Sequence, residues 1–175
     1  MSTRHIFSVL VENKPGVLAR VSGLFARRAF NIHSLAVGET EDPALSRITL
    51  VVDAAEIPIE QLKHQLNKLI NIIYLEQLEP ETSLQRRLVL VKVAANDQNR
   101  TNVIQVVDLF RAHIVDVVPD AVTIEATGSE QKIHAFLSAL SPYGIKELVQ
   151  SGSVAIGRGE RSISEQVLAE MRSEE

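Results

Sequence analysis

The stretch NKPGVL, residues 13 to 18, joins an apolar segment to a helix-like segment and is suited to bind a small charged molecule. The first backbone N–H groups of a helix have no partners within the helix and carry a partial positive charge. Here these donors are the amides of Gly16, Val17 and Leu18, and they suit a carboxylate as well as a phosphate. Gly16 has no Cβ to hinder a ligand, and Pro15 contributes no competing N–H. The turn therefore predicts an anion-binding helix start.

The side chain of Asn13 adds an amide that both donates and accepts hydrogen bonds. Its oxygen could accept from an ammonium group while its nitrogen donates to a carboxylate, and this combination suits a zwitterion. The apolar residues Leu18 and Ile32 could enclose a small aliphatic side chain. A plain strand-to-helix turn without a ligand is the simpler alternative, and these residues alone leave it open.

The elements that position this turn follow from the spacing of apolar residues. Up to residue 79 the order is strand, helix, strand, strand, helix and strand, and it is repeated after a short linker. The first unit has predicted strands at 5–12, 32–38, 46–53 and 72–79 and helices from Val17 onward and at 57–70. The second has predicted strands at 87–95, 113–118, 121–128 and 144–157 and helices at 102–112 and 129–140, with Ser129 as N-cap.

Two such repeats predict an α+β protein with two tandem ferredoxin-like βαββαβ domains. We expect the first domain at residues 1–79, a linker at 80–84, the second domain at 85–160 and a terminal helix or tail at 161–175. In this fold both helices cover one face of the sheet, whereas the strands here are apolar on both sides. We therefore expect an uncovered sheet face and association with a partner.

The second repeat lacks the features of the opening turn. At the equivalent place it reads VAANDQNRTNV, without Gly or Pro before the helix. If the fold itself required these residues, both repeats should contain them. We therefore expect the first repeat to be specialised for a ligand and the second for shape or partner contacts.

Composition excludes several classes of function. The formal charge of −4 and the low aromatic content of 4%, without Trp, do not fit a nucleic-acid-binding protein. The chain has no Cys, and its His residues lack metal-ligand spacing such as HExxH, so we predict neither a catalytic residue nor a metal site. No window approaches a membrane span and the N-terminal apolar run is too short for a signal peptide, so we expect a soluble, cytoplasmic protein without a membrane partner.

The stretches NKPGVLARVSGLFARRAFNIHSLAVG and DPALSRITLVV together resemble the ACT domain of the small regulatory subunit of acetohydroxyacid synthase (acetolactate synthase). The resemblance continues through LVLVKV, DLFRAHIVDV and SGSVAIGRG, so it covers nearly the whole chain. It implies a non-catalytic subunit that activates a large catalytic subunit and confers feedback inhibition by valine in branched-chain amino acid biosynthesis. It also implies that thiamine diphosphate, Mg and FAD are bound by the large subunit, with no cofactor in this chain.

The resemblance further implies a homodimer formed through the ACT domain, with valine bound at its interface. Asn13 and Gly16, with the amides of Val17 and Leu18, would hold the polar groups of valine, and Asn31 and Ile32 would approach from the partner chain. One alternative is a stand-alone ACT-type amino-acid sensor linked to transcription, which a basic face or a helix-turn-helix segment would favour. The other is a small α+β enzyme, which a strongly shifted pKa inside a pocket would favour.

Overall fold

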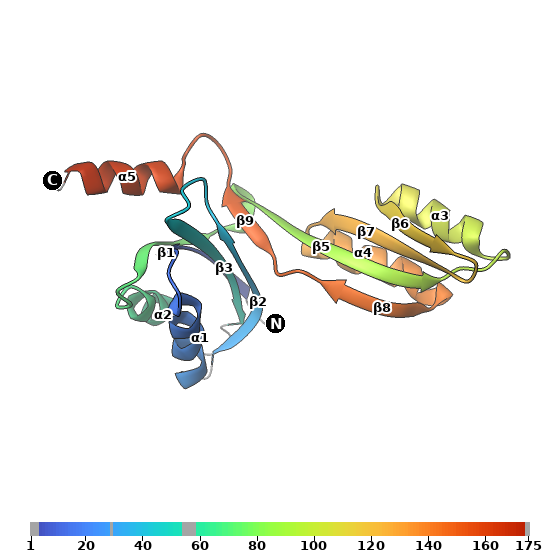
Figure 1. The fold of residues 1–175 in the computed structure, drawn as a ribbon, viewed down its shortest axis with the longest axis horizontal. Helices are drawn as coiled ribbons and strands as arrows, with labels where there is room; N and C mark the ends of the chain where they lie inside the picture. Colours follow the sequence, from blue (N-terminus) through green and yellow to red (C-terminus); the bar gives the residue numbers. More distant parts are fainter. Residues whose placement is uncertain (1–3, 29, 54–58, 174–175) are drawn as a thin grey trace. The chain divides into compact units, whose positions relative to one another are not determined.

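The computed structural model describes residues 4–28, 30–53 and 59–173. The elements up to residue 78 are β1 (Arg4–Glu12), α1 (Val17–Arg27), β2 (Asn31–Glu39), β3 (Leu45–Asp53), α2 (Ile59–Leu66) and β4 (Ile72–Leu78). A short 3-10 helix, η1 (Pro80–Thr82), precedes the second series, which is β5 (Ser83–Ala94), α3 (Arg100–Leu109), β6 (His113–Val118), β7 (Ala121–Gly128), α4 (Glu130–Leu140), η2 (Ser141–Tyr143) and β8 (Ile145–Gln150). The chain continues with β9 (Val154–Gly157) and α5 (Ile163–Ser173) (Figure 1).

The contacts divide the chain into two units. Unit 1 contains residues 1–84 and 153–175, and unit 2 contains residues 85–152. Each unit has the βαββαβ order of a ferredoxin-like fold, as the repeat in the sequence predicted. The start of the predicted helix at 57–70 lies outside the described residues.

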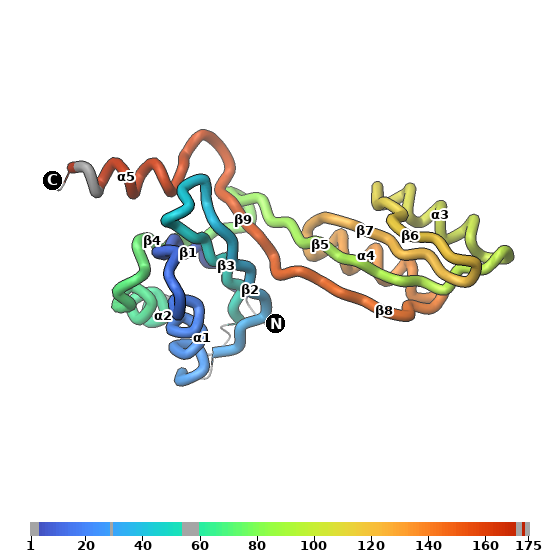
Figure 2. The backbone as a smooth tube through the Cα atoms, viewed as in Figure 1, coloured from blue at the N-terminus to red at the C-terminus, as the bar shows by residue number. Residues whose placement is uncertain are grey.

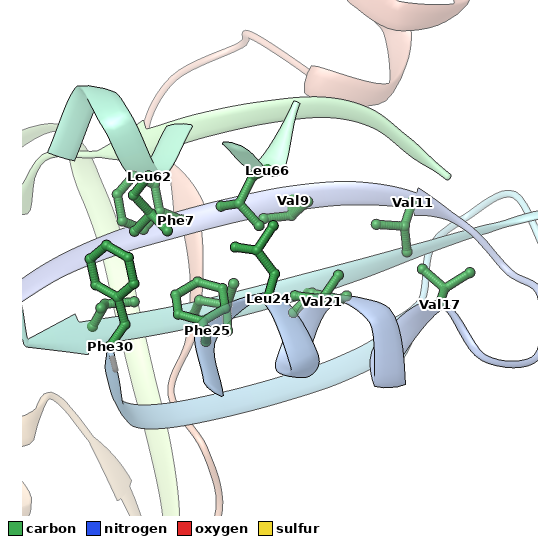
Figure 3. Packing of buried hydrophobic residues seen from close by; sticks show 13 residues of the cluster. Phe7, Val9, Val11, Val17, Val21, Leu24, Phe25, Phe30, Leu62 and Leu66 are labelled. Atoms are coloured by element: carbon green, nitrogen blue, oxygen red, sulfur yellow. The ribbon is translucent and has the colours of Figure 1, made fainter. Parts of the chain in front are cut away.

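In unit 1 the strands form an antiparallel sheet in the order β2-β3-β1-β4. Helices α1 and α2 pack on one face, where the apolar stripe of α1 meets alternate residues of β1 and β3 (Figure 3). The core between these layers consists of Phe7, Val9, Val11, Val17, Val21, Leu24, Phe25, Phe30, Ile48, Leu50, Val52, Leu62 and Leu66. This packing fixes where α1 begins relative to the end of β1.

The second face of the unit 1 sheet is covered in part, contrary to our expectation of an open face. Ala155 of β9 packs with Ile6, Val51 and Leu78, and Ile163 and Val167 of α5 pack with Leu10 and Leu45. Figure 2 shows this C-terminal segment, in red, against the strands of unit 1. The physical reason lies in β1, where residues on both faces, such as Phe7 (0% exposed) and Leu10 (1%), are buried and both need a cover.

The domain limits in the structure differ from the predicted ones at both ends of the second domain. Residues 83 and 84 of the predicted linker already belong to β5. Residues 153–160, which we assigned to the second domain, group with unit 1. Ala155 of this segment is buried against the second face of the unit 1 sheet. The spacing of apolar residues in the sequence does not specify which sheet such a segment will cover. The predicted terminal helix is present as α5.

In unit 2 the antiparallel sheet runs β6-β7-β5-β8, with α3 and α4 on one face. Its core consists of Val89, Val91, Val93, Ala95, Val103, Val107, Ala112, Val122, Ile124, Ala126, Ile133, Phe136 and Leu140. The hydroxyl of Ser129 accepts a hydrogen bond from the Lys132 backbone N–H at 3.2 Å, which confirms the predicted cap of α4. Unit 2 therefore repeats the architecture of unit 1 around a separate core.

Candidate functional site

The turn between β1 and α1 places Gly16 at the N-cap position of α1 with a φ of +85°. This left-handed conformation costs a residue with a Cβ about 1–2 kcal/mol, which explains the glycine. A Cβ at Gly16 would meet no atom within 4 Å, so the surface above the turn is open. The structure thus supports an accessible backbone here, and the immediate reason for glycine is the conformation of the turn.

The start of α1 has no side-chain cap and no acidic residue in its first turn. The helix N–H groups at this end therefore remain available to an external acceptor. Val17 is buried in the core, so only its backbone amide can serve a ligand, whereas Leu18 is 41% exposed and can contact one. The backbone amides at the start of α1 and the exposed Leu18 side chain therefore lie together at this end of the helix.

The start of α3 in unit 2 is organised differently. The Asn96 side-chain oxygen accepts hydrogen bonds from the backbone N–H groups of Gln98 (3.0 Å) and Asn99 (3.2 Å). The Asn99 side-chain oxygen accepts from the Asn96 N–H at 2.8 Å. These side-chain bonds lie in the turn that precedes α3, and the N-cap residue of α3, Asn99, has no side-chain cap hydrogen bond, as is also the case for α1. The two units therefore differ in the turn before the helix rather than in the capping of the helix itself.

Asn13 lies beside the open helix start with both of its side-chain amide hydrogens engaged. Its Nδ2 donates to the Pro43 carbonyl at 2.9 Å and to Glu39 Oε1 at 3.2 Å. Its backbone N–H donates to the Ala44 carbonyl at 2.8 Å. We predicted that the nitrogen would donate to a ligand carboxylate. In this structure that nitrogen is committed to the connector between β2 and β3, and the oxygen remains for a ligand.

A chain of polar contacts secures the other side of the turn. The Glu12 carboxylate accepts from Asn71 Nδ2 at 2.7 Å and from Lys14 Nζ at 3.1 Å. Arg20 of α1 donates in turn to the Asn71 side-chain oxygen. The hydrogen bond from Asn71, followed by that from Lys14, lowers the pKa of Glu12 below its usual value. These contacts tie α1 to the ends of β1 and β4.

Asn31 and Ile32, the remaining predicted ligand residues, lie at the opposite end of the sheet in the same chain. Asn31 pairs with Asp53, which pairs with Arg4 at the start of β1, whereas the turn follows Glu12 at its end. At about 3.4 Å per residue this register separates the two groups by about 27 Å. Figure 3 shows the neighbouring residues Val17 and Phe30 at opposite ends of the core.

The contacts of Asn31 and Ile32 within their own chain are local. Asn31 Nδ2 donates to Asp53 Oδ2 at 3.1 Å, and half-buried Ile32 packs against the unit 1 core. Neither of these contacts involves a residue of the turn between β1 and α1. One chain therefore does not bring the two predicted halves of the site together.

A pocket of about 610 Å³ in unit 1 is not lined by Gly16, Val17 or Leu18, the residues with the open donors of α1. It is formed by the end of β2, the edge of β4 and the segment that precedes α5, and Glu39 is among its residues. Glu41 in this pocket has a lowered pKa, chiefly because Ser164 hydrogen-bonds its carboxylate. Such a carboxylate stays ionised and does not resemble a general acid, so the pocket gives no support to the enzyme hypothesis.

Two further observations concern the described residues only. They contain no group of three or more His, Asp or Glu side chains that could hold a metal ion. They also contain no helix that is both long and apolar enough to cross a membrane.

Sequence reasoning missed Glu39 as a partner of Asn13. The two residues are 26 positions apart, and the pairing of β2 with β3 brings them together. The acidic connector was visible in the sequence, but no local pattern indicates which carboxylate turns toward Asn13.

Two family models together match most of the chain. The model of the AHAS (acetohydroxyacid synthase) small subunit-like ACT domain matches residues 7–74, and the model of the small subunit of acetolactate synthase matches residues 86–159. The acetolactate synthase small subunit of Mycolicibacterium smegmatis is 54% identical over 159 residues, which cover 91% of this chain and 94% of that protein. The probable acetolactate synthase small subunit of Methanothermobacter thermautotrophicus is 49% identical over 160 residues, or 91% and 95% of the two chains.

A solved structure agrees with these relatives. The crystal structure of the acetolactate synthase small subunit from Thermotoga maritima superimposes with a TM-score of 0.83 at 38% identity, and the match covers 91% of this chain and 99% of that one. Sequence, family models and fold thus agree over both units. The chain belongs to the family of acetolactate synthase small subunits, regulatory subunits whose first unit is an ACT domain.

Proposed function

We propose that this regulatory subunit activates the large catalytic subunit of acetolactate synthase and conveys feedback inhibition by valine. The observation that carries the proposal is the uncapped start of α1 with the Asn13 oxygen beside it. The valine carboxylate would accept from the amides of Gly16, Val17 and Leu18, and its ammonium group would donate to Asn13 Oδ1. Exposed Leu18 would contact the isopropyl group.

The proposal includes a homodimer in which each site is shared between two chains. The turn of one chain would face Asn31 and Ile32 of its partner, which would close the site around the ligand. The separation of about 27 Å between the two groups within one chain supports this arrangement, because a single chain cannot supply both. A two-fold dimer would then contain two equivalent sites.

Catalysis belongs to the large subunit in this proposal. That subunit would hold thiamine diphosphate, Mg and FAD and carry out the condensation in the cytoplasm, while this chain would change its rate. Because coupling between two sites is reciprocal, the large subunit should change the affinity for valine by the same factor that valine changes the affinity for the large subunit. The coupling free energy for such systems is about 1–3 kcal/mol.

The test is reconstitution with the cognate large subunit, in which the reaction rate is measured across a valine titration. We expect the chain to raise the rate and valine to lower it. In Gly16→Asp the new carboxylate would cap α1 and occupy the place of the valine carboxylate. The apparent affinity for valine should fall about 100-fold or more, because each hydrogen bond to a charged group contributes about 1.5–3 kcal/mol.

Gly159→Asp is a matched control for backbone strain and added charge. Gly159 also has a positive φ, +89°, and open space around its Cβ position, but it lies between β9 and α5. We expect this variant to keep the valine response. If valine binds the chain but leaves the rate of the large subunit unchanged, the protein is a stand-alone sensor and the regulatory proposal fails.

A further inference from the structure

The amide of Asn13 is held in one orientation by two acceptors. Its Nδ2 carries two hydrogens, and these are donated to the Pro43 carbonyl at 2.9 Å and to Glu39 Oε1 at 3.2 Å. An amide that turned over would place its oxygen against these two acceptors and lose both bonds. Asn13 therefore offers a ligand its oxygen, which is a hydrogen-bond acceptor only.

The two acceptors differ in how they are fixed. Pro43 lies in a connector with its own hydrogen bonds: the Ala44 N–H donates to Asp42 Oδ1 at 2.9 Å, and the Leu45 N–H donates to the Asp42 carbonyl at 2.9 Å. This places the Pro43 carbonyl by the fold of the connector itself. Glu39 is the last residue of β2 and acts through its side chain. It is the partner of Asn13 that a substitution can remove without changing the backbone.

We infer that Glu39 is a positioning residue that keeps the Asn13 oxygen toward the ligand and so makes the site select an α-ammonium group over a 2-oxo group. This inference rests on the proposed amino-acid site. The 2-oxo acid with the carbon skeleton of valine has the same carboxylate and the same isopropyl group. Neither the amides of α1 nor an apolar contact at Leu18 can distinguish the two molecules. Discrimination has to come from the group that meets the α-substituent.

The chemistry at Asn13 Oδ1 is opposite for the two ligands. An ammonium group donates a charge-assisted hydrogen bond to this oxygen, whereas a ketone oxygen has no hydrogen to donate and faces another lone pair. A site built to bond a donor rejects a ligand that lacks the donor, because its own polar group loses solvent and gains no partner. We expect wild-type protein to bind valine at least about 100-fold more tightly than the 2-oxo acid.

Two substitutions separate positioning from direct contact. In Glu39→Gln the side chain keeps a carbonyl oxygen that can accept from Asn13 Nδ2, so positioning is retained although the negative charge is lost. In Glu39→Ala one of the two acceptors is gone, so only the Pro43 carbonyl still holds the Asn13 amide, and the amide can turn its N–H groups toward the ligand more readily. If Glu39 instead paired directly with the ammonium of valine, both variants would lose affinity for valine.

The experiment is calorimetric titration of the full-length chain with L-valine and, separately, with its 2-oxo acid. Far-UV circular dichroism checks that each variant is folded. Glu41→Ala is the control, since Glu41 is also an exposed carboxylate near the end of β2 but is bonded by Ser164 rather than by Asn13. The quantity compared is the ratio of the two affinities. A general loss of stability would lower both affinities and leave this ratio unchanged.

We expect Glu39→Gln and Glu41→Ala to keep the ratio within about threefold of wild type, and Glu39→Ala to reduce it at least about tenfold, because a bond to a charged group is lost. The inference is overturned if Glu39→Ala keeps the wild-type ratio, or if Glu39→Gln loses as much as Glu39→Ala. Both of these outcomes leave valine binding by the wild type intact, so the proposed function stands. If the wild type binds neither ligand, the amino-acid site itself is wrong and the inference falls with it.

Discussion

The helix starts of α1 and α3 occupy the same place in two copies of one fold, and neither N-cap residue makes a side-chain cap hydrogen bond, but the turns that precede the two helices are built differently. At α3, Asn96 and Asn99 use their side chains to satisfy the backbone N–H groups of the turn. At α1 a glycine with a positive φ replaces any capping side chain, and the surface above it is open. The first unit gives up the stabilisation that a cap provides, about 0.5–2 kcal/mol. A turn that keeps free donors in this way is suited to a ligand.

The neighbours of the two turns extend this contrast. In unit 1, Asn13 uses its nitrogen for Glu39 and Pro43 and keeps its oxygen available. In unit 2, Arg100 at the start of α3 donates to the backbone carbonyls of Ala95, Val118 and Pro119, so it closes the turn against the β6–β7 connection. The turn of unit 1 thus leaves the Asn13 oxygen available to a ligand, whereas the turn of unit 2 is bonded to its own chain.

The largest effect is expected in a mixing experiment that tests whether the unit 1 turn binds valine together with a partner chain. It uses two variants, each of which we expect to have lost valine binding. Gly16→Asp damages the turn, and Asn31→Ala removes the polar group expected from the partner. In a mixed dimer one site carries both changes and the other carries neither. Random exchange of chains should therefore restore roughly one site in four. Valine binding measured by calorimetry before and after mixing tests this.

Recovery on mixing requires that the site be shared between chains. If both groups served one site within a single chain, every chain would still carry a damaged site and mixing would restore nothing. Each variant titrated alone is the control for incomplete loss. Exchange of chains can be demonstrated by mass spectrometry of the intact dimer. If the chains exchange but the mixture still does not bind valine, the shared site is contradicted.

An intermediate effect is expected when the side-chain hydrogen bonds of the turn before α3 are removed. Asn96→Ala removes the acceptor for the Gln98 and Asn99 N–H groups. The free energy of unfolding of unit 2 should fall by about 0.5–1.5 kcal/mol for each of the two hydrogen bonds that the turn before α3 loses. Hydrogen exchange of the amides in α3 and in β5 measures the change. Valine binding should remain as in the wild type.

The corresponding substitution in unit 1 serves as the comparison for Asn96→Ala. Asn13→Ala removes the amide beside α1, and it should weaken valine binding while changing the exchange of unit 2 amides little. If Asn96→Ala lowered the affinity for valine as much as Asn13→Ala does, the division of roles between the two turns would be wrong.

The smallest effect concerns two glutamates with lowered pKa values. At Glu12 the lowering comes first from the hydrogen bond of the neutral Asn71 amide, whereas at Glu147 it comes from the hydrogen bond and charge of Lys92. Salt screens charges more than it screens neutral dipoles. Added salt should therefore move the pKa of Glu147 toward 4.5 more than that of Glu12. Carboxyl ¹³C chemical shifts across a pH titration measure both.

The sign of the linked stability follows from the direction of these shifts. A carboxylate with a lower pKa in the folded state stabilises the fold above its unfolded pKa, and this contribution is lost as the pH falls through the folded value. Asn71→Ala should raise the pKa of Glu12 and reduce the loss of stability between neutral pH and the acid range. An unchanged Glu12 titration in that variant would contradict the assigned cause.

Much of the fold could be predicted from the sequence because its determinants are local. The strand at 5–12, the helix that begins at Val17 and the capping residue Ser129 all appear in the structure as predicted. Gly16 and Pro15 mark the turn by backbone chemistry that depends on these residues alone. The position of the ligand-suited turn was therefore readable without coordinates.

The contacts of the site could be predicted only in part. The contacts of the Asn13 nitrogen could not be predicted, because Glu39 at the end of β2 and Pro43 in the β2–β3 connector are distant from it in the sequence. The expectation of an uncovered sheet face was wrong in part, since β9 and α5 return to unit 1. Both depend on segments far apart in the sequence.

The sequence by itself determined the order of the elements, the two repeats and the specialised turn, because periodicity and turn chemistry act over a few residues. Only the tertiary structure decided which acceptors hold Asn13, which segment covers the second face of the unit 1 sheet, and that Asn31 lies at the far end from Gly16. Strand register and packing set these contacts, and they arise only when distant segments meet to bury apolar surface and satisfy polar groups.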